Sequence, residues 1–443
     1  MDWRVLIAAA IGAASSVLVN RDVAVFNDGF RPMYAEYFAG GSDRKALAAT
    51  GFALSIGLLL GYGITTSIAV GILIFHTYLL ASDIIGSACP KDTKGLVISA
   101  VAGAAWASFV FLGLNQIDAF MAWLPVDVMT PLGSLADYVI ATFPFFPALA
   151  CAYQFGVKKG AVTGGLVALS YVLMTKFGTF AVAGTKISLS AAGMSMLVGM
   201  VALVAFAMAE KTEAKGGLDT SAFDENAKRI RKNMVFFALN GGVLCMGTAI
   251  TIVTVGMTSG TLIHKGDIFG AGVFTVAGAL GYVPLVYTTA IASGVFSTGS
   301  RFVLAAGMFV SALGLGTVET LALAFVVGAL LELFEASIIS AVGNKMNSYP
   351  ALRVMGNHIR KSMSELLDVS LLVGSLVCGN ALTTQIGLGG LGALFVLGVW
   401  MLNKHAKKKL LMQMVAAPVA VLVLAVLVNV LVAIGLAAPI AAA

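Results

Sequence analysis

Long hydrophobic runs alternate with short polar stretches along the whole chain. A helix needs roughly 20 apolar residues to cross the hydrocarbon core of a bilayer. The runs that reach or approach this length are 3–19, 46–60, 64–88, 95–116, 134–156, 160–178, 187–209, 234–256, 267–298, 302–316, 318–343, 364–381, 385–403 and 411–437. Several are short enough for half-helices or hairpin arms, so the pattern predicts an all-α polytopic membrane protein with about 10–14 transmembrane or re-entrant helices.

The longest polar stretch, Glu210 to Asn233, divides the chain into two parts of similar length. We expect a first membrane repeat at 1–209, a cytoplasmic linker at 210–233 and a second membrane repeat at 234–443. Lys and Arg gather in this linker and in several other connections, which the positive-inside rule places in the cytoplasm. Both termini are then periplasmic, and an odd number of spans in each half gives the two halves opposite orientations.

Two pairs of matching stretches support this division. GYGITTSIAVG (61–71) and GYVPLVYTTAIASG (281–294) share a Gly-Tyr start and the ending TT-x-I-A-x-G. SLADYVIATFPFFPALACA (134–152) and SELLDVSLLVGSLVCGNA (364–381) each place an aspartate near the head of a hydrophobic span. Because the pairs recur in the same order, the sequence predicts an inverted-topology repeat, which is common in secondary transporters.

The composition narrows the class of protein. Hydrophobic residues make up 59% of the 443 residues and charged residues only 11%, against about 25% in an average soluble domain. The net charge of +6 comes from short Lys and Arg clusters that membrane orientation explains, so no nucleic-acid partner is expected. The cysteines and histidines lack metal-ligand spacing, and no catalytic or phosphate-binding motif occurs. We therefore expect no metal, no cofactor and no enzymatic activity.

A proline and several polar side chains interrupt one of the hydrophobic runs. Pro284 lacks an N–H and its ring obstructs the preceding turn, so we expect a broken helix near Tyr282, and the related stretch predicts a second break near Tyr62. Broken backbone at membrane depth persists only around protein or a wet cavity, which makes both breaks candidates for a solute site. The candidate substrate-binding residues are Gly61, Tyr62, Gly63, Thr65, Thr66, Gly281, Tyr282, Pro284, Tyr287, Thr288 and Thr289. The alternative is that the small residues only permit close helix packing and the proline only a kink.

Ionisable residues also fall inside the hydrophobic runs, where burying a charge costs about 2.5–3.5 kcal/mol. Glu332 and Glu335 share a helix face and are candidates for coupling transport to a proton or another cation. His76 and Asp83 lie two helical turns apart and are further coupling candidates. The alternatives are a solvated glutamate pair near the end of a span, a hydrogen-bonded core histidine and an aspartate near a membrane surface.

Other polar positions are secondary candidates. Asp137 and Asp368 lie near the heads of predicted spans, where a carboxylate can cap a helix N-terminus. Asn380 and Gln385 belong to a polar interruption that is either a surface loop or the tip of a re-entrant hairpin. The aromatic stretch 24–38 predicts a short helix in the membrane interface or a plain connector.

Several stretches resemble a known family. VAVFNDGFRP, LPVDVMTPLGSL and GYVPLVYTTAIASGV are similar, in this order, to stretches of the YhfT-like family of bacterial inner-membrane proteins. The resemblance implies a place in the bacterial inner membrane and a transport function. More distantly, the inverted layout resembles the elevator-type permeases of the phosphotransferase system, in the ascorbate and galactitol classes, and this analogy implies a homodimer.

We therefore expect an integral membrane transporter that moves a small polar solute, and in particular an anionic one, by elevator-like alternating access. One alternative is the permease component of a phosphotransferase-type system, which needs a separate cytoplasmic phosphocarrier because no phosphorylatable domain occurs in this sequence. A second alternative is a non-transporting membrane scaffold or an intramembrane enzyme. The expected partners are thus a small-molecule solute, the lipid bilayer and a second copy of the chain.

Overall fold

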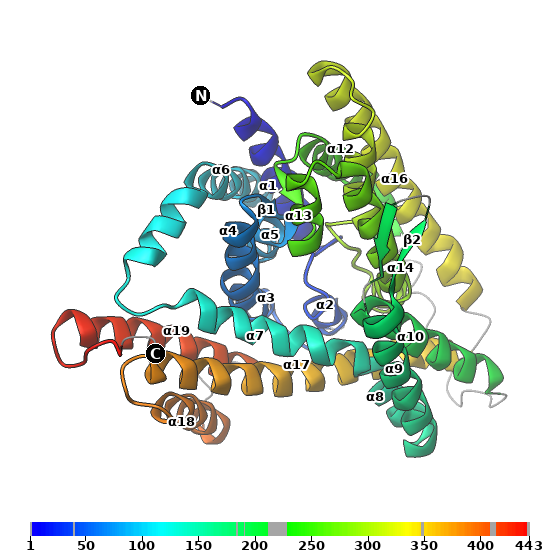
Figure 1. The fold of residues 1–443 in the computed structure, drawn as a ribbon. Coiled ribbons are helices and arrows are strands. Elements are labelled where there is room, and N and C mark those ends of the chain that lie inside the picture. The colour runs from blue at the N-terminus through cyan, green and yellow to red at the C-terminus, as the bar shows by residue number, and fades with distance from the viewer. Residues whose placement is uncertain are drawn as a thin grey trace.

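The computed structural model describes residues 2–38, 40–182, 185–189, 191–210, 228–346, 350–407 and 413–440, and it is dominated by helices, as the hydrophobic runs predict (Figure 1). The first half contains α1 (Arg4–Asn20), α2 (Arg31–Phe38), α3 (Arg44–Leu58), the π-helical turn η1 (Leu59–Ile64), α4 (Thr65–Val70), α5 (Phe75–Ala88), α6 (Thr93–Trp123), α7 (Met129–Thr142), the 3-10 turn η2 (Phe143–Phe145), α8 (Phe146–Phe155), α9 (Val157–Phe177) and α10 (Ala191–Ala209). The second half contains α12 (Met234–Ala249), α13 (Met257–His264), α14 (Ile268–Ser293), α15 (Arg301–Ser311), α16 (Thr317–Met346), α17 (Pro350–Thr384), α18 (Leu391–His405) and α19 (Gln413–Ala433). The described strands are β1 (Leu73–Ile74), β2 (Thr179–Val182), β3 (Thr185–Ser188) and β4 (Val253–Thr254).

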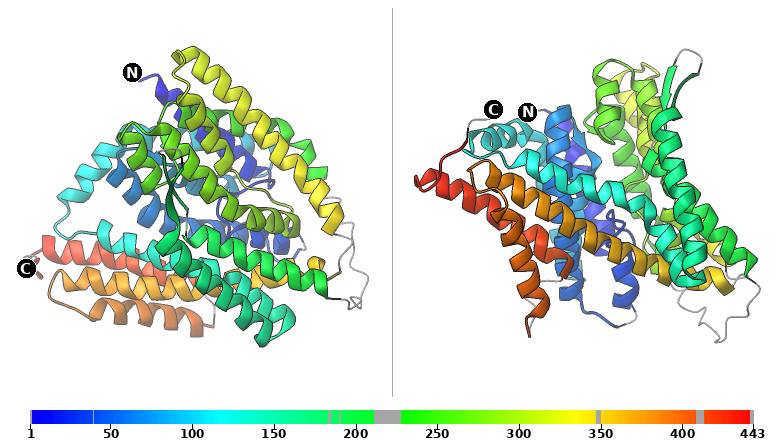
Figure 2. Two further views of the ribbon diagram at one scale, coloured as in Figure 1. Left: turned by 45° about the vertical axis from the view of Figure 1, so that its right-hand side comes forward. Right: turned by 60° about the horizontal axis from the view of Figure 1, so that its bottom comes forward.

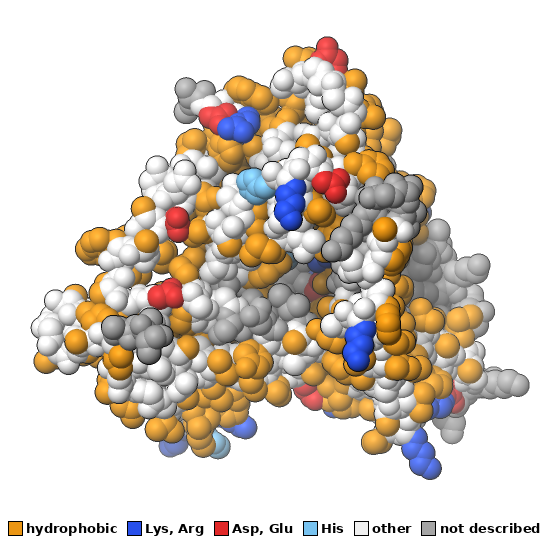
Figure 3. All heavy atoms as spheres, in the orientation of Figure 1, with side chains coloured by type: hydrophobic (Ala, Val, Ile, Leu, Met, Phe, Trp, Pro, Cys, Tyr) orange, Lys and Arg blue, Asp and Glu red, His pale blue; other side chains and the backbone are white. Residues whose placement is uncertain are grey.

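Within the described part of the chain, seven helical stretches are long and apolar enough to cross a membrane. They are Arg44–Val70, Thr93–Trp123, Val157–Phe177, Ala191–Ala209, Thr317–Ile338, Lys361–Thr384 and Ala416–Ala433. Hydrophobic side chains cover most of the face in Figure 3, and charged side chains are few and scattered. A surface of this kind suits lipid rather than water, so the prediction of a multi-pass membrane protein is confirmed.

The helices break later in the chain than predicted. α14 continues through Tyr282 and Pro284 and ends at Gly294, where φ is 70°. In the first half the helix passes Tyr62 in a π-helical turn and ends at Gly71, also with a φ of 70°. Glycine adopts this left-handed conformation without steric cost and closes a helix there, whereas the one hydrogen bond that a proline removes can be replaced inside a bundle. The predicted breaks at Tyr62 and Tyr282 are therefore wrong, and each helix stops instead at the final glycine of the shared motif TT-x-I-A-x-G.

Four extended segments connect helices and pair across the two halves of the chain. β1 and β4 run parallel with Leu73 opposite Val253, and Ala24 forms a parallel bridge to Phe296. Each segment follows a residue with positive φ, namely Asp22 (56°), Gly71 (70°), Thr251 (57°) and Gly294 (70°). The first extended segment of each half therefore lies beside the second extended segment of the other half.

Two long helix pairs cross at backbone distance. A Cβ on Gly12 of α1 would lie 2.1 Å from the carbonyl oxygen of Gly103 on α6. A Cβ on Gly241 of α12 would lie 2.4 Å from the carbonyl oxygen of Gly328 on α16. Glycine is thus required at both crossings, which bring two helices of one half together without intervening side chains.

The buried hydrophobic side chains form several clusters. The largest joins α1, α5 and α6 of the first half to α12, α15 and α16 of the second, with Ile11, Phe75 and Leu244 among its members. A second cluster joins α17, α18 and α19, which lie together beside α7 (Figures 1 and 2). The central cavity described below lies where α5, α15 and α16 meet α2, α13 and α14, beside η2 and the start of α10.

Two further expectations need correction, and a third is confirmed in part. The stretch 24–38 ends in the short helix α2, and Phe30 and Tyr34 are fully buried against protein, while its position at the membrane interface stays a prediction. Asp137 and Asp368 cap no helix start, because α7 and α17 begin well before them. The span expected at 134–156 is divided by η2, which contains Pro144.

Candidate functional site

A cavity of about 390 Å³ lies where the extended segments meet. Its wall includes residues from the turn before α2, from η1, from α14 and from α16. It also includes the first residues of three helices: Phe75 and His76 of α5, Met257 and Thr258 of α13, and Arg301 of α15. Because free N–H groups give a helix N-terminus a partial positive charge, these helix starts add positive potential to a wall that also contains the carboxyl groups of Asp28 and Glu335.

Arg31 is the most deeply buried cation of the cavity. It is only 1% exposed, although it stands at the first position of α2. One of its terminal nitrogens pairs with Asp28, while Nε and Nη1 have no hydrogen-bond partner within the described chain. A guanidinium has five N–H donors, and leaving buried donors unused is costly. Arg31 therefore carries two unsatisfied donors within the described chain, on a side chain at the cavity wall.

Arg301 lies on the α14–α15 side of the cavity. Its guanidinium carbon stands 3.8 Å from the ring centre of Tyr282, a cation–π arrangement. Ser300 caps α15 by accepting a hydrogen bond from the Val303 N–H at 3.3 Å, and its hydroxyl donates to Glu335 at 2.8 Å. The cap fixes the start of α15 and so holds Arg301 at the cavity wall.

Aromatic rings form much of the remaining wall. His76 meets Tyr62 and Phe26 edge to face, with ring centres 4.8 and 5.0 Å apart. Its Nδ1 is buried and has no hydrogen-bond partner among the described residues. A Cβ on Gly256, just before α13, would lie 3.1 Å from the Tyr62 hydroxyl, so η1 and the start of α13 meet here. The site thus offers apolar faces together with polar edges.

The cavity brings together only part of the predicted site. Tyr62, Tyr282, Tyr287, His76 and Glu335 line it. Gly63, Thr65, Thr66, Asp83 and Glu332 are not among its lining residues, and Thr65 instead donates to the Tyr62 carbonyl oxygen at 3.3 Å. For Gly61, Gly281, Pro284, Thr288 and Thr289 only the backbone is described, and their role stays a prediction.

The remaining candidates hold the backbone. Asp83 accepts hydrogen bonds from the N–H groups of Phe26 and Asn27 at 2.8 and 2.7 Å, which fixes the extended segment beside the cavity. Gln385 exchanges two hydrogen bonds with the backbone of Asp127, and Asn380 accepts one from Gly390. Asn380 and Gln385 thus order the turn between α17 and α18.

The sequence interpretation missed the two arginines. In the sequence, Arg31 lies among the basic residues of a connection assigned to the cytoplasm, and Arg301 lies between two hydrophobic runs with no assigned role. Both are isolated arginines that follow an extended segment and begin a helix. An isolated basic residue directly after a break between apolar segments is the signal that could have identified them.

Comparison with known proteins places this chain in a family. The family model YhfT, described as a protein of unknown function, matches residues 4–437. The chain belongs to the YhfT family. It is also 28% identical over 459 residues to the uncharacterized protein YhfT of Escherichia coli (strain K12), an alignment that covers 98% of this chain and 99% of the relative. The family resemblance is thus confirmed; no solved structure matches the chain, and the likeness to phosphotransferase permeases stays a prediction.

Proposed function

We propose that this member of the YhfT family is a transporter that carries a small organic anion across the bacterial inner membrane through the central cavity. The observation that carries the proposal is Arg31, a buried guanidinium with unused donors at the wall of a cavity in a membrane protein. Arg301 and the starts of α5, α13 and α15 add positive potential to the same space. The volume of about 390 Å³ suits a small molecule, since ligand pockets span about 300–1,000 Å³.

The recurring order of elements supports alternating access. A helix, an extended segment, a short helix, a long helix closed by glycine and a second extended segment follow one another in both halves. The cross-pairing of Ala24 with Phe296 and of Leu73 with Val253 is what a two-fold relation between the halves would give. We infer an inverted repeat whose halves meet at the cavity, with both termini periplasmic and a homodimer as the assembly.

A ligand screen followed by uptake tests the proposal. Small carboxylates and phosphate esters are screened by thermal shift on purified protein, because a ligand of the native state raises apparent stability. A hit is then measured for uptake into proteoliposomes. Arg301→Gln should weaken binding of that anion about tenfold or more, the value expected for losing a charged hydrogen bond. The matched change Arg4→Gln, at the exposed first residue of α1 and outside the cavity lining, should leave binding unchanged.

The outcomes separate the rival functions. Uptake without other proteins supports the transporter. Uptake only with a cytoplasmic extract and phosphate donor, giving phosphorylated product, would favour the phosphotransferase alternative. Binding without uptake would point to a scaffold or an intramembrane enzyme. Equal anion binding by Arg301→Gln and the unmodified protein would show that the anion does not bind in this cavity.

A further inference from the structure

A buried carboxyl lies beside the cavity wall but outside the anion site. Glu332 on α16 is fully buried, and neither of its carboxyl oxygens has a hydrogen-bond partner in the described part of the chain. An ionised carboxylate without a partner is expensive in a membrane interior. The position therefore needs either a bound cation or a proton.

Among the residues that the structure describes, the neighbours of Glu332 supply no counter-charge. α12 approaches so closely that a Cβ on Gly241 would lie 2.5 Å from the Cβ of Glu332. Next to it, the amide of Asn240 donates to Ser15 of α1 at 2.8 Å, so the facing groups of α12 and α1 are uncharged. The titratable groups that interact with Glu332 are Glu335 on α16 and Tyr287 on α14. None of them carries a positive charge.

A proton suits this position better than a metal ion. Metal cations such as Ca²⁺ collect about six to eight oxygen ligands, and even smaller ions need several. Across the described residues, no group of three or more His, Cys, Asp or Glu side chains could hold a metal ion. A single carboxyl behind an apolar helix crossing can, by contrast, be neutralised by one proton.

Glu335 connects this position to the cavity. It lies three residues after Glu332 and therefore on the same face of α16, one turn away. Glu335 lines the cavity and accepts a hydrogen bond of 2.8 Å from the hydroxyl of Ser300, the residue that precedes Arg301. The pair thus consists of one carboxyl at the cavity wall and one enclosed behind it.

We propose that Glu332 is a proton-binding site that exchanges with the cavity through Glu335. In the exchange the O–H bond of the Glu335 acid breaks and its proton forms an O–H bond on the Glu332 carboxylate. The proton site needs no transport activity, but its consequence rests on the proposed function: an anion held beside Arg301 would move together with a proton. The assignment makes the protein a proton–anion symporter.

Infrared spectroscopy of the purified protein tests the site without any substrate. At neutral pH the unmodified protein should show the C=O stretch of a protonated, buried carboxyl, and Glu332→Gln should remove it. Glu319→Gln, at an exposed position in the first turn of the same helix, is the matched control and should leave the band unchanged. Glutamine has nearly the shape of a neutral glutamic acid, so the variant should fold, which size-exclusion chromatography and thermal unfolding verify.

The route through Glu335 has its own readout. Transfer to D₂O shifts the carboxyl band as the proton exchanges, and Glu335→Gln should slow this shift while keeping the band. Unchanged exchange in that variant would overturn the route. A spectrum with no band that depends on Glu332, or a band that disappears when NaCl replaces choline chloride at constant pH, would overturn the proton site. Neither result depends on whether the anion of the thermal-shift screen is found.

Discussion

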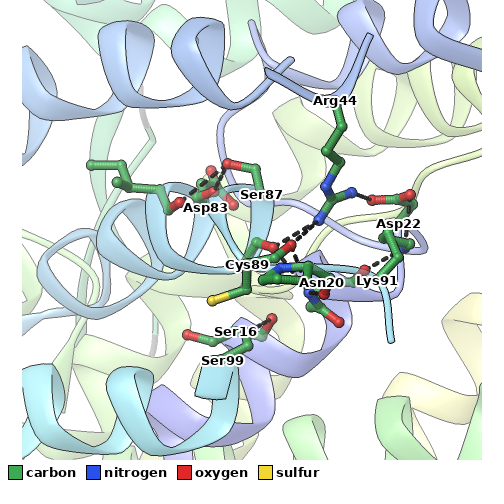
Figure 4. Close-up of polar contacts among 12 residues, drawn as sticks. Ser16, Asn20, Asp22, Arg44, Asp83, Ser87, Cys89, Lys91 and Ser99 are labelled. Atoms are coloured by element: carbon green, nitrogen blue, oxygen red, sulfur yellow. Dashed lines mark hydrogen bonds and ion pairs between the residues drawn. The ribbon is translucent and has the colours of Figure 1, made fainter. Parts of the chain in front are cut away.

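Two groups of charged residues in this protein differ in how completely their charges and hydrogen-bonding atoms are paired. The first surrounds Asp22, at the end of α1 (Figure 4). One carboxylate oxygen of Asp22 pairs with Arg44 and the other with Lys91 at 2.8 Å. Arg44 also donates to the carbonyl oxygens of Gly86 and Cys89, so each charge has a partner and, among the Arg44 nitrogens, Nε alone has none within the described residues. Burial lowers the pKa of the Lys91 ammonium, and Asp22 counteracts this by favouring its charged form.

The second group surrounds the cavity, and its partners are incomplete. Arg31 has one counter-charge and two unused nitrogens, and the Nδ1 atom of His76 is buried without a partner in the described residues. Glu332 lies behind the cavity wall, and neither of its carboxyl oxygens has a hydrogen-bond partner in the described residues. The two groups contain similar residue types, but Lys91 is 40% exposed and Arg44 20%, whereas Arg31 and Glu332 are almost completely enclosed. The difference teaches that the charges of the Asp22 group compensate one another within the fold, whereas the cavity group keeps donors and acceptors that pair with nothing in the described residues.

The largest effect is expected from Asp22→Asn, which turns the satisfied group into an unsatisfied one. Asparagine tolerates the positive φ of 56°, so the change removes the charge and leaves Arg44 and Lys91 without a carboxylate. The free energy of unfolding should fall by about 3 kcal/mol, as for breaking a buried ion pair. Thermal unfolding in detergent measures this.

Asp2→Asn is the matched control for that change. Asp2 pairs with Arg4 at 2.6 Å on the surface, and exposed pairs contribute little to stability, so no measurable change in unfolding is expected. A similar loss at Asp2 and Asp22 would show that burial does not distinguish the two pairs. Anion binding by the folded fraction of Asp22→Asn should be preserved, since Asp22 does not line the cavity.

A smaller effect is expected at Gly71, which ends the long helix before β1. Alanine there should cost about 1–2 kcal/mol because a Cβ disfavours the left-handed backbone. Gly71→Asn should cost less, since asparagine adopts that conformation more readily. Gly113→Ala in the interior of α6 is the control with opposite sign, because alanine stabilises a helix interior by about 0.5–1 kcal/mol. Equal unfolding temperatures for both alanine variants would argue against a conformational requirement at Gly71.

Hydrophobic length predicted most helices of this fold, but the positions where two of them end were not predicted. α6 and α16 follow directly from their apolar runs, and Gly71 and Gly294 belong to the repeated motif. The choice of Pro284 as the break failed because proline removes one hydrogen bond, whereas a left-handed glycine redirects the chain.

The site was less predictable because its parts are joined by long-range pairing. β1 and β4 have two residues each and meet across 180 positions of sequence, which no local period encodes. That pairing sets the starts of α5 and α13 at one cavity. It also brings Arg31 and Arg301 to one cavity wall; an isolated basic residue after a break marks each of them in the sequence, but not that they lie together.

The smallest effect is expected at Thr298. A substitution there tests whether a buried group without a hydrogen-bond partner is by itself a sign of function. Its hydroxyl is fully buried and has no partner among the described residues, yet Thr298 is not among the residues that line the cavity. Thr298→Val replaces that hydroxyl with a methyl group of similar size, so unfolding should stay within about 0.5 kcal/mol or shift toward greater stability. Anion binding should stay the same.

The neighbouring hydroxyl of Ser300 provides the contrast. Ser300→Ala removes the cap of α15 and the hydrogen bond to Glu335, so it should cost about 1 kcal/mol in unfolding and also weaken the anion site. Both variants are measured by thermal unfolding and by binding of the anion found in the screen. Loss of binding in a folded Thr298→Val protein would extend the site behind Phe296 and would mean that the unpartnered groups, rather than the cavity wall, define where the solute is held.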